Sequence, residues 1–220
     1  LIICGNPNYE KIINIKKNLQ SLGVKTIRKK YFKNYNDKKI IIFIDESSND
    51  GDSRLFKSSE YTFSGRKNAH NRNEVIAGEV LDALNQLEIN YHFVVRLHPK
   101  SNTEDYKSLL NEIDEFSHGS DPFEEIFSAD LIVGMTSMLL MESFLLGKQV
   151  ISAIPREHEK DWAPPGLLHS ISCVTTSNML KTAINQALKK SNTLIKETKY
   201  KELGSRKIIM DFLSSLLKDK

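Results

Sequence analysis

The chain has 220 residues, of which 40% are hydrophobic and 27% charged, and its formal net charge is only +3. This composition is typical of a globular protein with one sizeable core, and it excludes a disordered or collagen-like chain. The small basic excess suits an anionic small ligand or an acidic membrane surface. It gives no indication of a nucleic-acid partner.

Two features bear on cellular location. Cys4 and Cys173 lie far apart and no C-x-x-C pair exists, so neither a disulfide framework nor a zinc site is predicted and a reducing cytoplasm is expected. The longest apolar stretch, Leu131–Leu146, is interrupted by hydroxyl and carboxyl side chains and is too short for a membrane span. Because the chain begins at Leu1 inside an apolar segment, we expect it to be part of a longer protein.

Strands are predicted to alternate with helices along the chain. In chain order, we expect a strand at Leu1–Cys4, a helix over Ile12–Leu22, a strand at Ile40–Ile44, a helix over Asn73–Leu87, a strand at Tyr91–Leu97, a helix over Thr103–Ile113, a short strand at Phe116, a helix from Asp121 to Ser128, a strand at Leu131–Val133, a helix over Met138–Leu146, strands at Gln149–Ile154 and Ile171–Thr175, and helices over Ser177–Leu188 and Arg206–Leu217. This alternation predicts an α/β fold with a parallel sheet covered by helices on both faces.

Ligands of such sheets bind at the carboxyl ends of the strands. His98 stands at one such end, preceded by Arg96 and followed by Pro99, which fixes the turn. An imidazole there can donate a hydrogen bond to a phosphate, more strongly when protonated. The alternative is that His98 only caps its loop.

A second strand end carries a possible anion site. Gly134 allows a tight turn, and Thr136 and Ser137 fall at the N-terminus of the next predicted helix. Free backbone N–H groups beside hydroxyls bind anions, although Ser and Thr are also ordinary helix caps. Further along the same helix, Glu142 is a carboxylate in an apolar run and needs a partner. That partner is either a pair of ligand hydroxyls, as on a ribose, or a basic side chain.

Other charged residues are weaker candidates for contacts with a ligand. Arg54, Lys57, Arg66 and Lys67 lie in the aperiodic stretch 45–67 and could reach phosphates, but exposed loop cations are usually solvated. The segment Arg156–Glu159 follows a strand end and could line the same cleft. There is no G-x-G-x-x-G after a strand and no P-loop, which argues against a dinucleotide-dependent dehydrogenase and an ATPase.

Two segments carry a family resemblance. "RLHPK" and "DPFEEIFSADLIVGMTSMLLMESFLLGKQVISAIP" resemble the C-terminal, donor-binding half of GT-B-fold glycosyltransferases. The similarity is closest to the CDP-glycerol glycerophosphotransferase-like and bacterial sialyltransferase-like groups of polysaccharide biosynthesis. The resemblance implies that His98, Thr136 and Ser137 bind the donor phosphates and that Glu142 binds the donor ribose, with Arg96, Pro99 and Gly134 in support. Ser143 and Gln149 depart from the usual residues of this motif without disturbing that assignment.

The resemblance also implies a domain plan. "IICGNPNYEKI" is more loosely similar to the crossover between the two GT-B halves, so residues 1–36 would be a crossover segment and helix, 37–190 the donor domain, and 191–220 a C-terminal helix. The acceptor domain and the general base would lie outside this chain, and no catalytic residue is assigned here. A nucleotide-sugar or CDP-polyol donor is expected as substrate, with no metal and no cofactor. We expect an enzyme of the cytoplasm, associated with the inner face of the membrane, whose isolated donor half binds donor without transferring it.

Two rival interpretations stay open. Non-hydrolysing UDP-N-acetylglucosamine 2-epimerases share this fold, but Met135, Thr136 and Ser137 replace their S-G-G turn, and Glu142 lacks their acidic neighbour. The other rival is a non-catalytic module that binds a nucleotide or a protein. Turnover by the full-length protein would exclude the module, and release of free nucleotide would indicate a transferase rather than an epimerase.

Overall fold

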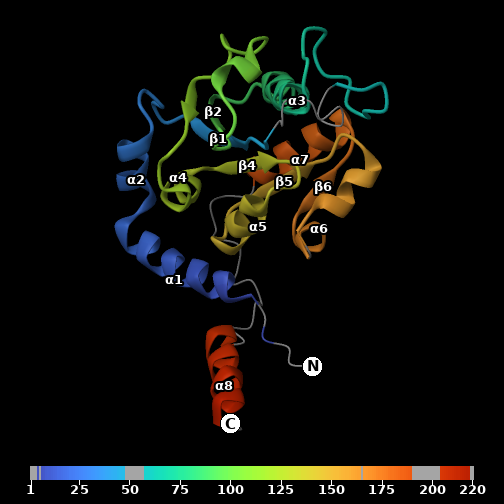
Figure 1. Cartoon of the computed structure of the whole chain (residues 1–220). Coiled ribbons are helices and arrows are strands. Elements are labelled where there is room, and N and C mark those ends of the chain that lie inside the picture. The colour runs from blue at the N-terminus through green and yellow to red at the C-terminus, as the bar shows by residue number, and fades with distance from the viewer. Residues whose placement is uncertain (1–3, 5, 48–56, 165, 190–203, 219–220) are drawn as a thin grey trace.

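The computed structural model describes residues 4, 6–47, 57–164, 166–189 and 204–218. They form a six-stranded parallel sheet with helices on both faces (Figure 1). The strands are β1 (Lys39–Ile44), β2 (Tyr91–Arg96), β3 (Glu115–Ser117), β4 (Leu131–Gly134), β5 (Val150–Ala153) and β6 (Ser172–Val174). Their order is β3-β2-β1-β4-β5-β6, and every neighbouring pair is parallel. The predicted Rossmann-like α/β fold is confirmed.

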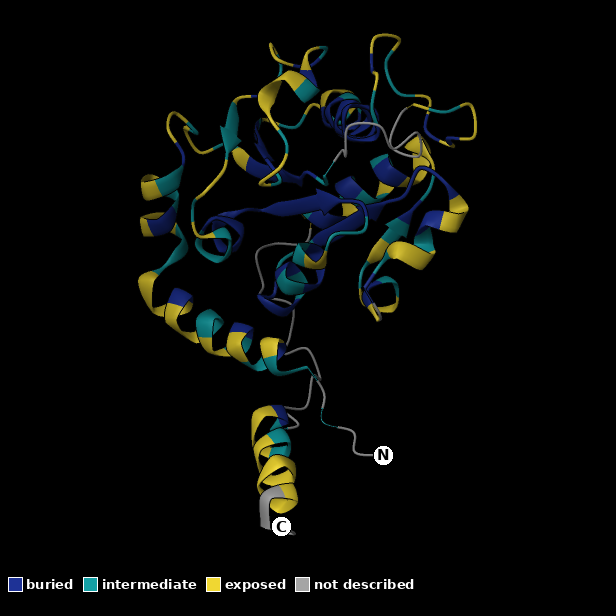
Figure 2. Ribbon diagram, viewed as in Figure 1, coloured by how far each residue is buried: buried dark blue, intermediate teal, exposed yellow. Residues whose placement is uncertain are grey.

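The central strands are apolar because both of their faces are covered. Along β1, Ile41 and Phe43 pack into the core on one side, while Ile40, Ile42 and Ile44 pack into the core on the other. The strands at the centre of Figure 2 are accordingly coloured as buried. A buried parallel strand therefore reads as a continuous hydrophobic run, which is why β1 and β4 were predictable from sequence.

Each face of the sheet has its own helices. One core is completed by α3 (Arg72–Gln86), α7 (Ser177–Lys189) and the 3₁₀ turn η2 (Thr103–Tyr106). The other is completed by α1 (Pro7–Leu22), α2 (Val24–Tyr31), α4 (Pro122–Ser128), α5 (Met138–Leu145) and α6 (Leu167–Ser170). The 3₁₀ turn η3 (Glu157–Trp162) follows β5. None of the described helices combines the length and hydrophobicity that a bilayer crossing requires.

Some local features depart from the expected elements. The sequence predicts no helix between Leu22 and Ile40, but the chain there contains the helix α2, which buries Ile27. The helix expected over Thr103–Ile113 is only the 3₁₀ turn η2, whose start is capped by Asn102 and Asp105. The residues that follow it form turns rather than an α-helix. Finally, α7 begins at Ser177 as expected, and the residue before it, Thr176, accepts the N–H of Met179 with its hydroxyl at 3.4 Å. The strand expected at 1–4 lies almost entirely outside the described residues.

The first helix of the chain, α1, contacts the start of the last described helix. Helices α1 and α2 bury Tyr9, Ile12, Leu19 and Ile27 in the same core as α5. The last helix, α8 (Ser205–Lys218), projects away from the sheet, as Figure 1 shows. Its backbone N–H at Ser205 donates to the Glu10 carboxylate of α1. Beyond that contact α8 exposes several large apolar side chains, namely Met210, Phe212, Leu213 and Leu216.

Candidate functional site

A pocket of about 770 Å³ opens at the carboxyl end of the sheet. The strand order reverses beside it, since β1 leads to β2 on one side and the chain later returns to β4 on the other. Open α/β sheets bind ligands at such a switch point. The pocket is lined from the end of β1 (Ile44, Asp45), the end of β2 (Arg96 to Pro99), the loop of Ser101 to Thr103, the segment after β3 (His118 to Ser120), Pro122 at the start of α4, and the start of α5 (Ser137, Leu139).

His98 lies on this pocket, as predicted, and two contacts fix its loop. Its ring Nδ1 accepts the backbone N–H of Lys100 at 3.2 Å. This pattern assigns the proton of the neutral ring to Nε2, which leaves a donor at the far end of the imidazole. The backbone N–H of His98 donates to Asp45 Oδ2 at 2.9 Å.

Asp45 is a buried anchor that sequence reasoning missed. Its Oδ1 accepts the hydroxyl of Tyr106 at 2.8 Å, so one carboxylate ties the end of β1 to the His98 loop and to η2. Burial raises the pKa of the Asp45 carboxyl, and burial also raises the pKa of Tyr106. The available signal was position, because Asp45 directly follows a buried strand.

Arg96 braces the wall of the pocket. Its guanidinium pairs with the buried carboxylate of Glu125, and it also donates to the hydroxyl and carbonyl of Ser120 at 2.8 and 2.9 Å. The charge of Arg96 is therefore engaged within the protein. Its supporting role is to join the end of β2 to α4 and to the segment that follows β3.

The turn after β4 requires its glycine. A Cβ on Gly134 would lie 3.0 Å from Leu140 Cδ2 and 3.3 Å from the backbone oxygen of Ile44. Glycine at the end of β4 thus leaves room for Leu140 of α5 and for the end of β1 to pack closely against this strand. Ser137 caps the helix by accepting the N–H of Leu139 at 3.2 Å, and it lines the pocket together with His98. His98 and Ser137 therefore line the same pocket.

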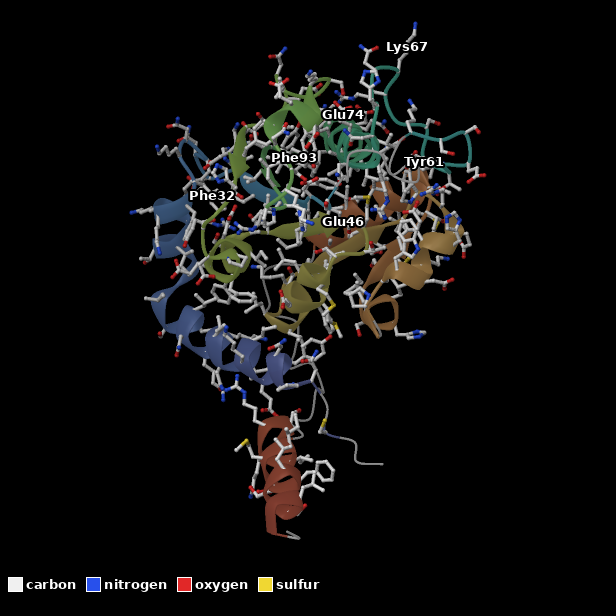
Figure 3. All side chains as sticks on the ribbon, in the orientation of Figure 1. Phe32, Glu46, Tyr61, Lys67, Glu74 and Phe93 are labelled. Carbon is white, nitrogen blue, oxygen red and sulfur yellow. The ribbon has the colours of Figure 1, made fainter. Side chains whose placement is uncertain are left out.

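Thr136 faces a different partner from Ser137. Its backbone N–H and its hydroxyl both donate to the carboxylate of Glu46, the hydroxyl at 2.9 Å. Glu46 directly follows Asp45 at the end of β1 and is labelled in Figure 3. The donors at Thr136 that the sequence assigned to phosphate are therefore occupied by an internal carboxylate.

Behind Glu46 lies a chain of charges. Arg72 of α3 donates to Glu46 Oε2 at 2.6 Å and approaches Glu159 Oε2 to 2.5 Å, and Arg156 donates to the other oxygen of Glu159 at 2.5 Å. The ring of Trp162 covers Arg72, with 5.5 Å from its centroid to Cζ. Of the segment Arg156–Glu159, Arg156 and Glu159 thus belong to this buried network rather than to the pocket lining.

Glu142 lies outside the pocket lining but on the same face of α5 as Leu139, one helical turn further on. It is half-buried. Burial raises the pKa of its carboxyl, and the ammonium of Lys11 on α1 partly opposes this. The ribose-binding role of Glu142 therefore stays a prediction, since its carboxylate does not line the pocket.

The loop cations lie elsewhere. Lys57 donates to the backbone oxygen of Arg66 at 2.9 Å, and Arg66 itself pairs with Asp82 and Glu112. Lys67 is exposed and extends outward in Figure 3. Arg54 lies outside the described residues. Within the described part of the chain, no group of three or more His, Cys, Asp or Glu is arranged to hold a metal ion.

Comparison with known proteins gives structural matches only. No family model matches the chain, and no curated protein is similar to it in sequence. The UDP-GlcNAc 2-epimerase of Methanocaldococcus jannaschii, solved with UDP-GlcNAc and UDP, matches with a TM-score of 0.62 at 12% identity over 97% of this chain and 54% of that one. The Neisseria meningitidis enzyme bound to UDP-GlcNAc matches with a TM-score of 0.56 at 13% identity, over 97% and 54% of the two chains.

These matches concern the fold. The wall teichoic acid polymerase TagF is a more distant match, with a TM-score of 0.46 at 13% identity over 97% of this chain and 50% of that one. The chain spans about half the length of each of these structures. Together with the strand order, the epimerase matches show a Rossmann-like fold equivalent to one half of a GT-B-type protein, as the resemblance implied.

Proposed function

We propose that this chain is the donor-binding half of a GT-B-type transferase and binds a nucleotide-activated sugar or polyol phosphate. The observation that carries the proposal is the convergence of His98 and Ser137, from the ends of two different strands, on one pocket at the switch point of the sheet. The two epimerase structures, which hold UDP-GlcNAc, support a nucleotide sugar as the kind of ligand.

The proposed chemistry at the pocket is stabilisation of phosphate charge. The Nε2–H of His98, Thr136, the Ser137 hydroxyl and the first N–H groups of α5 would bind a donor phosphate and the negative charge that grows on it as the sugar leaves. Glu142 would hold the ribose hydroxyls further along α5. Arg96, Pro99 and Gly134 would keep these groups in place.

Transfer itself requires a second half. An acceptor and a general base would be supplied by a facing domain, because holding both reactants in near-attack geometry is worth roughly 7–11 kcal/mol of barrier. We further propose that the whole enzyme assembles a surface polysaccharide, working in the cytoplasm at the membrane face from a cytoplasmic nucleotide-activated donor.

Calorimetry with CMP, CDP, UDP, GDP and their nucleosides tests the proposal. We expect one nucleotide to bind and its nucleoside to bind more weakly, since the phosphate contacts are lost. Absence of binding by every nucleotide at millimolar concentration would refute the proposal.

The second candidate is an epimerase-like enzyme, favoured by the epimerase matches. The two differ in their products. A transferase in its full-length form releases free nucleotide only when an acceptor is consumed, whereas an epimerase interconverts UDP-GlcNAc with its C2 epimer without any acceptor. Nuclear magnetic resonance of UDP-GlcNAc incubated with the full-length protein separates them.

A further inference from the structure

The N-terminus of α5 already holds an anion from within the chain. The carboxylate of Glu46 accepts both the backbone N–H and the hydroxyl of Thr136. Thr136 directly precedes the N-cap Ser137, so this carboxylate lies beside the positive end of the α5 dipole, where negative charge is favoured. It occupies a backbone N–H and a hydroxyl that could equally bind two oxygens of a phosphate.

The Glu46 side chain has several hydrogen-bond partners but is not fully buried. Its side chain is 15% exposed, while its partner Arg72 is only 3% exposed. The backbone of Glu46 is fixed separately, because its carbonyl oxygen accepts from Asn73 Nδ2 at 2.8 Å and its N–H donates to Asn73 Oδ1 at 3.2 Å. The side chain can therefore change partners while the end of β1 stays in place.

A donor phosphate and Glu46 would compete for the same groups. Two anions cannot share the N–H and hydroxyl of Thr136, and like charges placed side by side in a partly buried site repel strongly. We propose that Glu46 is a displaceable internal anion, which the donor phosphate replaces at Thr136 when it binds. This inference rests on the proposed function, since it concerns the same phosphate site.

Arg72 makes the exchange feasible. Its Nη1 donates to Glu46 Oε2 at 2.6 Å, while its Nε and Nη2 face Glu159. A Glu46 side chain that leaves Thr136 therefore keeps a cationic partner. The exchange also sets a minimum binding free energy for a ligand. Its contacts with His98 and Ser137 must release more free energy than is lost when Glu46 leaves Thr136. Weakly bound anions are excluded and phosphates attached to a larger donor are favoured.

The chain contains its own reporter. Trp162 is the only tryptophan in the sequence, and its ring covers the guanidinium of Arg72. Movement of Glu46 off Thr136 changes the position of the carboxylate paired with Arg72 and hence the surroundings of this indole. We therefore expect tryptophan fluorescence to report the exchange.

The test uses pyrophosphate and orthophosphate as probes, with Glu46→Gln compared with wild type by calorimetry. Glu60→Gln is the matched control, because it removes the same charge from an exposed position of the same loop. We expect Glu46→Gln to bind pyrophosphate about tenfold more tightly or better, since the competing charge is gone, and Glu60→Gln to bind as wild type does. Equal or weaker binding by a folded Glu46→Gln would overturn the inference.

Fluorescence of the wild-type protein is a second measurement, and it does not depend on whether the variant folds. Saturating pyrophosphate should shift the Trp162 emission of wild type, and should shift that of Glu46→Gln much less. An unchanged wild-type emission at saturation would overturn the exchange.

The proposed function is judged separately from the exchange. Nucleotide binding without tighter pyrophosphate binding by Glu46→Gln defeats only the exchange. Pyrophosphate binding by Glu46→Gln with no nucleotide binding by either protein defeats only the nucleotide assignment. Binding of no phosphate probe to either protein defeats both.

Discussion

Buried charges lie at both ends of the sheet, but they serve different partners. At the amino end, Asp130 accepts the guanidinium of Arg28 at 2.7 Å and the backbone N–H of Ile40 at 2.9 Å, and Lys148 donates to the backbone oxygen of Phe127 at 2.9 Å. At the carboxyl end, Asp45 and Glu46 hold the loops that border an open pocket.

The difference shows how to interpret a buried charge. At the amino end, the charged groups mainly complete hydrogen bonds that the strand and helix ends would otherwise lack, so their loss should reduce stability alone. At the carboxyl end, the charged groups position donors that a ligand is proposed to use. Substitutions there should change binding more than stability.

The largest effect is expected from Asp130→Ala at the amino end. Removing this carboxylate leaves the N–H of Ile40 without its acceptor and Arg28 without its ion-pair partner, although Arg28 keeps its bond to the Ser128 oxygen. Breaking a buried ion pair costs about 3–5 kcal/mol. Chemical denaturation measures the loss, with Asp211→Ala on the exposed α8 as control. If the folded Asp130→Ala protein also loses nucleotide affinity, the two ends are not functionally separate.

A pH-dependent effect is expected from Lys148. Burial lowers the pKa of its ammonium to about 8 from an ordinary value of 10.5. The native state therefore disfavours the charge, and the full penalty applies below about pH 8. The free energy of unfolding should rise by up to about 3 kcal/mol between pH 8 and 10.5, relative to Lys148→Met. Parallel stability curves for the two proteins across this range would contradict the assignment.

At the carboxyl end, His98→Ala should weaken nucleotide binding by about ten- to a hundredfold, because a charge-assisted hydrogen bond is worth roughly 1.5–3 kcal/mol. Nucleoside binding should change much less, and the melting temperature should stay close to that of wild type. Calorimetry with a nucleotide and its nucleoside measures the contrast. An equal loss for both ligands would assign His98 to the loop structure, as Asp130 is assigned to the sheet.

The smallest change is expected from Glu142→Gln. The ribose contact is common to nucleotide and nucleoside, so both should weaken to a similar extent, by about tenfold. The same calorimetric pair checks this. Undiminished binding of both ligands would instead assign the half-buried carboxylate to its electrostatic partner on α1, Lys11.

The sheet was predictable because its strands are buried on both faces and read as apolar runs. The same logic located His98 and Ser137, since His98 directly follows one such run and Ser137 lies in the turn after another. The helix α2 was missed because one buried residue, Ile27, lies among lysines and an arginine. Val24, Ile27 and Tyr31 do stand at helical spacing and pack on one core, but the pattern spans only eight residues between polar stretches.

The charge network was beyond sequence reasoning for a different reason. Arg72 pairs with Glu46, 26 positions away, and with Glu159, 87 positions away. Local patterns carry no information about pairs at such separations. For the same reason, the sequence assigned Thr136 to a ligand phosphate and gave no sign that Glu46 holds it.

The two edge strands of the sheet affect whether copies of the chain aggregate. Both outer strands, β3 and β6, are only three residues long, and they carry Glu115, Ser117 and Ser172 among their residues. Unpaired N–H and C=O groups on a long, flat edge recruit strands from other molecules, which begins aggregation. Here each edge offers too few of these groups, on too polar a strand, to template another chain.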